Sequence, residues 1–351
     1  MKRKGRIWIK RCNMTNNTIS FNKQGYDPFI DFIKAYAIIC VLIGHTVPYT
    51  YMMYAGYGLW AGMQVPLFIL IQVFHYYKKE NPKLSIKTLF QRIIFPFLIF
   101  GVFTFVILVL SGKEQDVKWL LIKGLRNGGG YGPGSYYPII YLQITLLLPI
   151  FRVLFIKMSK KTLFWIFLFI SEGLEILCSL TQPPAWLYRI LAIRYVFLIY
   201  LGWLWVKDGI KMDWKTIILS ILSLHSIVYF EYVSVYFKIN NEPLFFDTSW
   251  TFHRWPCYFF CSTGLIYVLH IIYQKLRNND KINSCIKVLA KSSYEVFLVQ
   301  MTFCYLFKPE HVPFVDNLYL QFAIRIVLVW VVSIFGGIVV NILYKRIFNT
   351  K

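Results

Sequence analysis

Long apolar runs follow one another along the whole chain, separated by short polar stretches. A hydrocarbon core about 30 Å thick is crossed by about 20 residues of α-helix. About ten segments meet this requirement, at residues 30–50, 58–77, 93–111, 136–156, 162–180, 185–206, 215–236, 252–274, 286–306 and 318–344. Barrel strands are shorter and alternate apolar with polar residues. We therefore expect an all-α membrane protein, with a bundle of about ten transmembrane helices in residues 30–351.

The composition and the cysteine pattern agree with this class. Hydrophobic residues make up 57% of the chain and charged residues 15%, whereas soluble domains have about 45–50% and about 25%. The 7 cysteines are scattered, and most lie in apolar runs. We interpret them as small apolar packing residues, and we predict neither a disulfide framework nor a metal site.

Lys and Arg residues alternate between the two sides of the predicted bundle. Of the 38 in the chain, 27 lie in the two terminal segments and in every second connection, 6 lie in the other connections and 5 fall inside spans, when residues near the end of a span are counted with the adjoining connection. Because Lys and Arg are enriched in cytoplasmic loops, both termini are predicted to be cytoplasmic, in a multi-pass protein of the inner membrane. This distribution explains the net charge of +22 without a nucleic acid partner, which would need a basic face on a soluble fold.

Residues 1–29 are predicted to form a basic cytoplasmic tail ahead of the membrane domain. They include several Lys and Arg residues but no apolar core, so no cleavable secretory signal is expected. Met14 offers an alternative start, in which case residues 1–13 would not belong to the natural protein.

Ionisable side chains inside spans are costly, and they usually face a bundle interior or a water-filled cavity. The first span carries Lys34 and His45, eleven positions apart. At 100° per residue this spacing is about 20° past three full turns, so both side chains project from one helix face, about 16 Å apart along the axis. Lys34 is expected near the cytoplasmic interface and His45 in the outer half of the membrane. Gly44 would let another backbone or a substrate approach closely there.

Each of these residues has two interpretations. His45 could serve as a general base, because imidazole titrates near neutral pH, or it could be a buried histidine satisfied by a neighbouring hydroxyl or carbonyl. Lys34 could bind an anion or simply snorkel to the interface. Asp31, Glu172 or Glu231 could orient His45, although interhelical ion pairs also explain the buried charges.

Several segments resemble the acyltransferase 3 family of membrane proteins, in the order that the family shows. They are DFIKA at 31–35 followed by His45, MQVPLF at 63–68, RIIFPFL at 92–98, YYP at 136–138 with Pro149 and Ile150, FLIYLGW at 197–203 and SSYEVFL at 292–298. In that family a basic residue precedes a catalytic His by ten intervening residues, as Lys34 precedes His45. The resemblance covers residues 27–345.

Three positions depart from the family pattern. Lys34 stands where Arg is commoner, so a bidentate grip on phosphate or carboxylate is lost while the charge remains. The family often has two Arg three apart at the start of its third helix. Here Arg92 is present, the earlier position is Leu89, and Lys87 could substitute. Gln300 stands where the penultimate helix often has His, and we assign that position no role.

The resemblance implies an integral-membrane O-acyltransferase. Such proteins move an acyl group, often acetyl, from acyl-CoA to a hydroxyl of a carbohydrate or lipid-linked glycan, so a surface polysaccharide or its precursor is the expected acceptor. Acetyl-CoA is the expected donor substrate, with no permanently bound cofactor. The resemblance makes His45 the catalytic base. It also makes Lys34, Arg92 and Lys87 cations for the CoA phosphates, although ordinary cytoplasmic charge also explains Arg92 and Lys87.

Other classes of protein share many of these features. A glycan or lipid transporter or flippase would have the same spans and buried charges without chemistry, and a sensor or scaffold is a third class. The pairing of Lys34 and His45 on one face favours the enzyme, because a pure transporter needs neither a histidine at that spacing nor a site for CoA. Direct transfer is favoured over an acyl-enzyme, because no Ser or Cys stands out as a carrier. The glycine-rich segment 128–134 is expected to be a turn-rich, mobile loop on the outer side.

Overall fold

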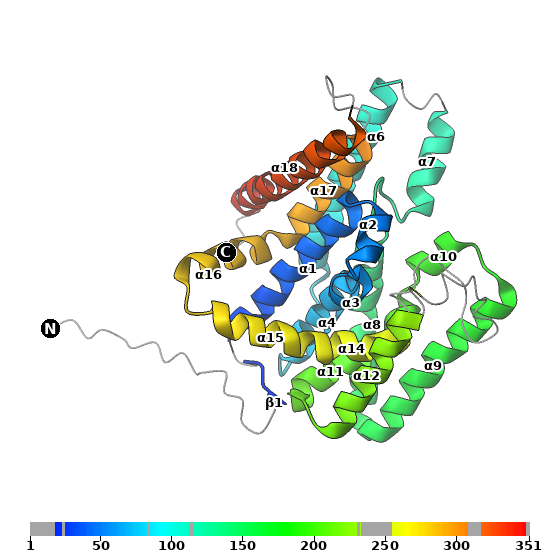
Figure 1. Cartoon of the computed structure of the whole chain (residues 1–351). Coiled ribbons are helices and arrows are strands. Elements are labelled where there is room, and N and C mark those ends of the chain that lie inside the picture. The colour runs from blue at the N-terminus through cyan, green and yellow to red at the C-terminus, as the bar shows by residue number, and fades with distance from the viewer. Residues whose placement is uncertain are drawn as a thin grey trace.

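The computed structural model describes residues 18–22, 25–82, 84–112, 116–229, 232, 255–307 and 317–348. Helices form nearly all of this part, which confirms the predicted all-α class (Figure 1). In chain order the elements are β1 (Thr18–Ile19), α1 (Pro28–Thr46), α2 (Tyr49–Tyr54), α3 (Tyr57–Trp60), α4 (Gln64–Tyr77), α5 (Ile86–Leu89), η1 (Phe90–Ile94), α6 (Phe95–Leu110), α7 (Val117–Arg126), α8 (Tyr137–Lys157), α9 (Lys160–Thr181), α10 (Ala185–Ile190), η2 (Ala192–Tyr195), α11 (Val196–Asp208), β2 (Ile210–Lys211), α12 (Trp214–Val228), η5 (Trp255–Cys257), α14 (Tyr258–Ser262), α15 (Gly264–Leu276), α16 (Asp280–Lys291), α17 (Ser293–Leu306) and α18 (Leu318–Ile347).

Within the described residues, 7 helical segments are long and apolar enough to cross a membrane. They are Pro28–Thr46, Tyr57–Tyr77, Ile86–Leu110, Tyr137–Lys157, Lys160–Thr181, Trp255–Leu276 and Tyr319–Ile347. Each matches one of the predicted spans. The other three predicted spans, at 185–206, 215–236 and 286–306, contain helices that are shorter or interrupted. The protein is therefore a multi-pass membrane protein, and the total of ten spans stays a prediction.

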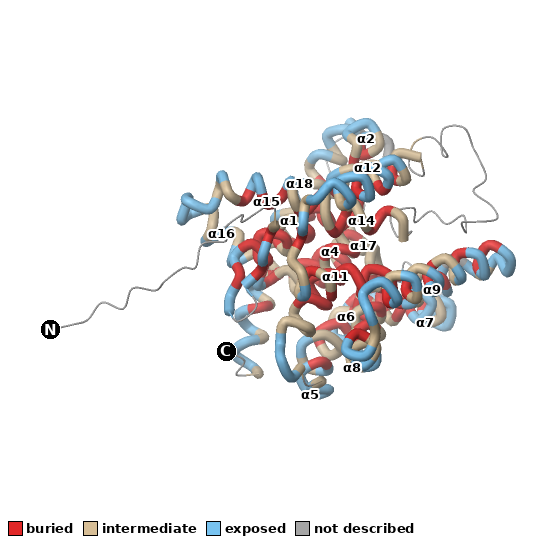
Figure 2. The backbone as a smooth tube through the Cα atoms, turned by 90° about the horizontal axis from the view of Figure 1, so that it is seen from below, coloured by how far each residue is buried: buried red, intermediate tan, exposed pale blue. Residues whose placement is uncertain are grey.

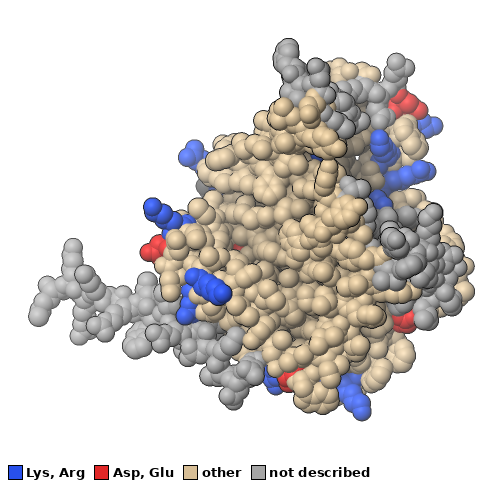
Figure 3. All heavy atoms as spheres, viewed as in Figure 1, with Lys and Arg blue, Asp and Glu red and all other residues tan. Residues whose placement is uncertain are grey.

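The surface suits a lipid environment. On the face in Figure 3, the charged residues lie towards the margins and a broad uncharged area separates them. Large apolar side chains such as Val102 and Phe169 are well exposed, at 62% and 68%. Such extensive apolar exposure marks an interaction surface, and for spans of this length the partner is membrane lipid.

Helices α4 and α11 form the centre of the bundle, and in Figure 2 the buried backbone gathers along them, α1 and α17. Leu67, Leu70 and Phe74 on α4 are fully buried, as is Phe197 on α11. Gly202 of α11 allows the close approach of the two helices, since a Cβ there would lie 2.9 Å from the Cβ of Val73. This close packing holds α4 in a fixed position, including the side of α4 that does not contact α11.

The described part of the predicted N-terminal tail includes a short strand. Strand β1 pairs antiparallel with β2, with Thr18 opposite Lys211. Ile19 and Phe21 are buried, and the ring of Phe21 stacks on that of Trp205 at 5.3 Å between centroids. The segment just before α1 is thus anchored to the end of α11.

A test of the packing is the crossing of α17 and α18, which lie side by side (Figure 1). A Cβ at Gly337 would lie 2.5 Å from both the backbone nitrogen and the Cα of Val296. Because backbone cannot rotate away, Gly337→Ala is expected to cost about 1–3 kcal/mol of folding free energy through overpacking.

The matched control for this substitution is Gly173→Ala in α9, where an added Cβ meets nothing within 4 Å in the described part of the chain. Ala has the higher helix propensity, so the control is expected to match or slightly exceed the wild type. Thermal unfolding of the detergent-solubilised protein measures both. Equal midpoints for Gly337→Ala and Gly173→Ala would contradict the close crossing.

Candidate active site

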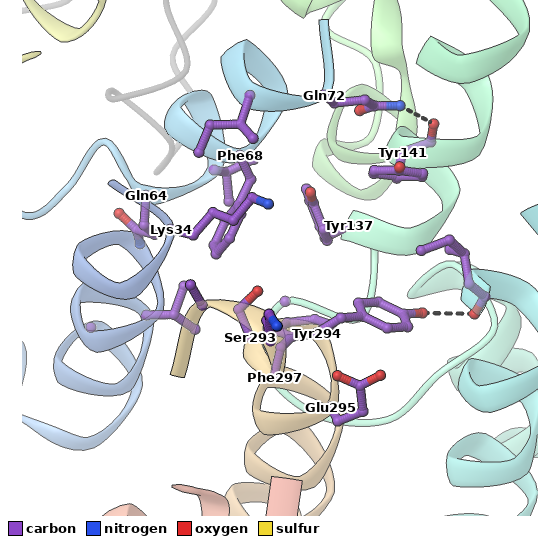
Figure 4. Close-up of a pocket in the computed structure, with 18 of the residues that line it drawn as sticks. Lys34, Gln64, Phe68, Gln72, Tyr137, Tyr141, Ser293, Tyr294, Glu295 and Phe297 are labelled. Carbon is purple, nitrogen blue, oxygen red and sulfur yellow. Dashed lines mark hydrogen bonds between the residues drawn. The ribbon is translucent and has the colours of Figure 1, made fainter. Parts of the chain in front are cut away.

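A cavity of about 650 Å³ lies within the bundle and brings together Lys34 and His45, the two residues that the first span predicts to share a face. Its walls come from α1, α2, α3, α4, η1, α8, α16, α17 and α18, with the loops before α4 and α8. Figure 4 shows Lys34 of α1, Tyr137 of α8 and Tyr294 of α17 extending toward one shared space. Segments that are distant in the sequence therefore meet at one internal site.

Lys34 and His45 both line this cavity, as their helical spacing predicts. Lys34 is partly buried, with 24% of its side chain exposed, and its ammonium lies 3.8 Å from a carboxylate oxygen of Asp31. Tyr26 donates a hydrogen bond of 2.7 Å to the other oxygen of that carboxylate. Lys34 thus faces the cavity instead of snorkelling along a lipid-facing surface.

His45 has an amide partner. Its Nδ1 lies 3.3 Å from Oε1 of Gln300 on α17, and because an amide oxygen only accepts, Nδ1 carries the hydrogen. The amide nitrogen of Gln300 in turn donates to Sγ of Cys304 at 3.3 Å. Gln300 is fully buried. These two hydrogen bonds therefore hold the imidazole of His45 with its lone pair on Nε2. The one signal for this contact in the sequence is a polar residue in an apolar helix, which does not reveal a role for Gln300.

Two of the three carboxylates considered as partners of His45 bind elsewhere. Asp31 pairs with Lys34 and Tyr26. Glu172 accepts a hydrogen bond of 2.7 Å from the indole nitrogen of Trp255, and Glu231 lies outside the described residues. Among the described residues, the partner that orients the histidine is therefore a neutral amide and not one of these carboxylates.

One end of the cavity is cationic and reaches the surface. Arg92, Lys291 and Lys345 line it and are exposed. Glu295 is the acidic residue on this part of the wall. We call these three cations, together with Lys34, the cationic mouth. Such a concentration of positive charge in a concave site attracts polyanions.

A wide helical turn accounts for the position of Arg92. In η1 the Phe95 amide bonds to the Phe90 carbonyl, five residues back, and such turns are frequent at functional sites. Carbonyls of this turn accept bonds from neighbouring helices, with Tyr294 donating to Ile93 at 2.7 Å and Tyr344 donating to Gln91. Arg92 is thus held against α17 and α18. Lys87 is exposed in α5 and is not part of the cavity wall.

Glycines surround the opposite end of the cavity, near His45. A side chain at Gly44 would overlap the Tyr57 hydroxyl, which donates to the Cys40 carbonyl at 3.3 Å. Gly134 has a φ of +83°, and a Cβ there would lie 3.5 Å from Cε1 of His45 and 2.8 Å from Phe297. The glycine-rich segment 128–134 is turn-rich as predicted, and its last turn packs directly against the imidazole.

Between the two ends the walls are largely aromatic. Phe68, Tyr137, Tyr141 and Phe297 line this stretch, and Gln72 of α4 is the amide among them. A mainly apolar cavity with a few polar groups is typical of small-molecule sites. The cavity thus joins a cationic mouth to a histidine through an aromatic middle.

Comparison with known protein families agrees with the family resemblance of the sequence motifs. No curated protein and no solved structure matches the chain. A model of the acyltransferase 3 family, described as an acyltransferase domain, matches residues 27–346. This match includes every residue of the cavity wall and spans nearly the whole sequence, so the chain belongs to the acyltransferase 3 family of membrane acyltransferases.

Proposed function

We propose that the protein is an O-acyltransferase that moves an acyl group, most simply acetyl, from acyl-CoA to a hydroxyl of a surface polysaccharide or lipid-linked glycan. The observation that carries this proposal is the single cavity that joins the cationic mouth to His45. CoA carries its negative charge at the nucleotide end and its acyl group at the other end of a thin arm. A passage with cations at one end and a base at the other suits that molecule.

The proposed reaction is a direct transfer. Nε2 of His45 accepts the proton of the acceptor hydroxyl, and the oxygen attacks the thioester carbonyl carbon. The carbon–sulfur bond then breaks, and the leaving thiolate of CoA takes the proton from His45. Gln300 keeps Nδ1 protonated throughout, so that Nε2 is the nitrogen that exchanges the proton.

The orientation in the membrane follows from the charge pattern. We propose ten spans, with both termini in the cytoplasm of a cell whose inner membrane holds the protein. The mouth residues Arg92, Lys291 and Lys345 belong to segments that carry the Lys and Arg excess, which supports a cytoplasmic mouth. Acyl-CoA would then enter from the cytoplasm, and the glycan would reach His45 from the other side.

The acceptor class is the part of the proposal that whole cells test best. Ester content of the cell-surface glycan is compared, by NMR and by base-labile acetate, between a strain lacking the gene and the same strain complemented with it. The complemented strain is expected to carry acetyl esters that the deletion strain lacks. Identical glycans in the two strains would remove surface glycan as the acceptor.

Lys34 provides a test of the donor site. Removing its charge in Lys34→Ala is expected to raise the KM for acetyl-CoA about 10- to 100-fold, the range for a lost charge-assisted hydrogen bond. Lys34→Arg keeps the charge and is expected to stay close to the wild type. Lys281→Ala, an exposed position on α16 outside the cavity wall, is the matched control. An unchanged KM in Lys34→Ala would exclude this lysine from donor binding.

A role of Lys87 in binding the CoA phosphates stays a prediction of the sequence alone.

A further inference from the structure

A buried glutamine that lines the aromatic middle of the cavity uses one side of its amide, and the other side has no partner among the described residues. Gln72 is 8% exposed. Its amide nitrogen donates to the Tyr141 carbonyl at 2.9 Å and to the Thr145 hydroxyl at 2.7 Å. Thr145 donates its own hydrogen to the Tyr141 carbonyl at 2.7 Å, so its oxygen is free to accept from Gln72. Both amide hydrogens of Gln72 are therefore used on α8.

This arrangement holds the amide in one orientation. A flipped amide would set the Gln72 oxygen against the Tyr141 carbonyl, which can only accept. The oxygen Oε1 is thus held on the side of the amide away from the contacts with α8 (Figure 4), and this buried oxygen has no hydrogen-bond partner within the part of the chain that the structure describes. Leaving a buried acceptor unsatisfied is costly, so such a group in a cavity calls for a ligand that donates.

The position of Gln72 indicates which donor it meets. On α4, Gln64, Phe68, Gln72 and His75 all line the cavity, as their spacing of three to four residues requires. Gln64 lies at the end near Gly44, and Lys34 lies at the cationic mouth. A molecule that reaches from the mouth to His45 passes Gln72 with its middle portion. In acyl-CoA that portion is the pantetheine arm, whose two secondary amides each offer one N–H.

We propose that Oε1 of Gln72 accepts a hydrogen bond from an amide N–H of the pantetheine arm of the donor. This inference rests on the proposed function and adds a binding site for the neutral part of the donor. The cationic mouth attracts the phosphates of the donor, whereas the hydrogen bond to Gln72 sets how deep the pantetheine arm lies in the cavity. Together they place the thioester carbonyl at the depth of His45.

The experiment compares kcat/KM for acetyl-CoA with kcat/KM for donor analogues in the same protein, so that each protein serves as its own reference. The full-length protein, reconstituted in liposomes, is assayed with acetyl-CoA and with two analogues in which one amide N–H at a time is replaced by an ester oxygen. The wild type is expected to prefer acetyl-CoA over one of the analogues by about 3- to 10-fold in kcat/KM, the effect of one neutral hydrogen bond. In Gln72→Leu this preference is expected to disappear.

Gln143→Leu is the matched control. Gln143 lies on α8, and its amide is satisfied at both ends, donating to Ile190 at 2.7 Å and accepting from Ala192 at 2.9 Å. It is not on the cavity wall, so this variant is expected to keep the full preference. The ratio within one protein does not depend on how much of it is folded.

Each outcome has one meaning. A wild type that uses both analogues as well as acetyl-CoA would overturn the inference, since water would then satisfy Gln72. A Gln72→Leu variant that keeps the preference would overturn it too. Absence of any transfer from acetyl-CoA by the wild type would instead overturn the proposed function, and the inference with it.

Discussion

Replacing His45 by alanine is expected to lower kcat for acetyl transfer by about 10²- to 10⁴-fold, the usual contribution of a general base. The alcohol of a glycan is a weak nucleophile until its proton is removed. Within the described residues the cavity wall holds one other histidine, His75, which lies on α4 beyond Gln72 and away from the glycine-rich end. The KM for acetyl-CoA is expected to change little, because the mouth residues remain.

The measurement is acetyl transfer by protein reconstituted at equal density, with the amount of folded protein checked by gel filtration. His225→Ala is the control, because His225 is exposed on α12 and is not part of the cavity wall. It is expected to keep full activity. If His45→Ala retained activity within about threefold of the wild type, far from the loss of a general base, the proposed chemistry would be wrong.

Local periodicity explains what could be predicted from the sequence. The apolar runs predicted the seven longest spans, because each helix in lipid must satisfy its own backbone. The shared face of Lys34 and His45 depends only on the rotation per residue within α1, and both residues do line one cavity. Such predictions need no knowledge of how the helices are arranged.

The interruptions of other helices were less predictable. Leu191 adopts an extended conformation and separates α10 from the residues that follow. Ser292, with φ of −104° and ψ of 8°, separates α16 from α17. Both breaks occur within apolar stretches that hydropathy alone reads as continuous. Where a neighbouring helix supplies the missing contacts, an interrupted helix is tolerated.

Contacts between distant segments could not be predicted from one sequence. Lys291 and Lys345 belong to a large set of similar basic residues, and only the packing of α16 and α18 distinguishes those that line the cavity. Lys87 has the same charge but stays outside it. Gln300 is 255 positions from His45 and carries no charge to mark it. Tertiary packing, not residue type, selects the members of this site.

Replacing Gln300 by leucine is expected to lower kcat by about 10- to 100-fold, the range for loss of a partner that orients a histidine. Without the amide oxygen, Nδ1 of His45 has no acceptor from α17, and the ring is free to change its tautomer and its orientation. A fraction of the enzyme would then present a protonated Nε2, which cannot take a proton from the acceptor. The KM for acetyl-CoA is expected to remain the same, because Gln300 is not on the cavity wall.

The split between kcat and KM distinguishes this positioning role from a general loss of packing. Cys304→Ala is the matched control, because it removes the acceptor at the far end of Gln300 but leaves the amide oxygen on His45. It is expected to keep kcat within about threefold, the effect of one weak hydrogen bond. Equal losses of kcat in Gln300→Leu and Cys304→Ala would point to packing of α17 as the cause. An unchanged kcat in Gln300→Leu would show that His45 holds its reactive tautomer without the amide.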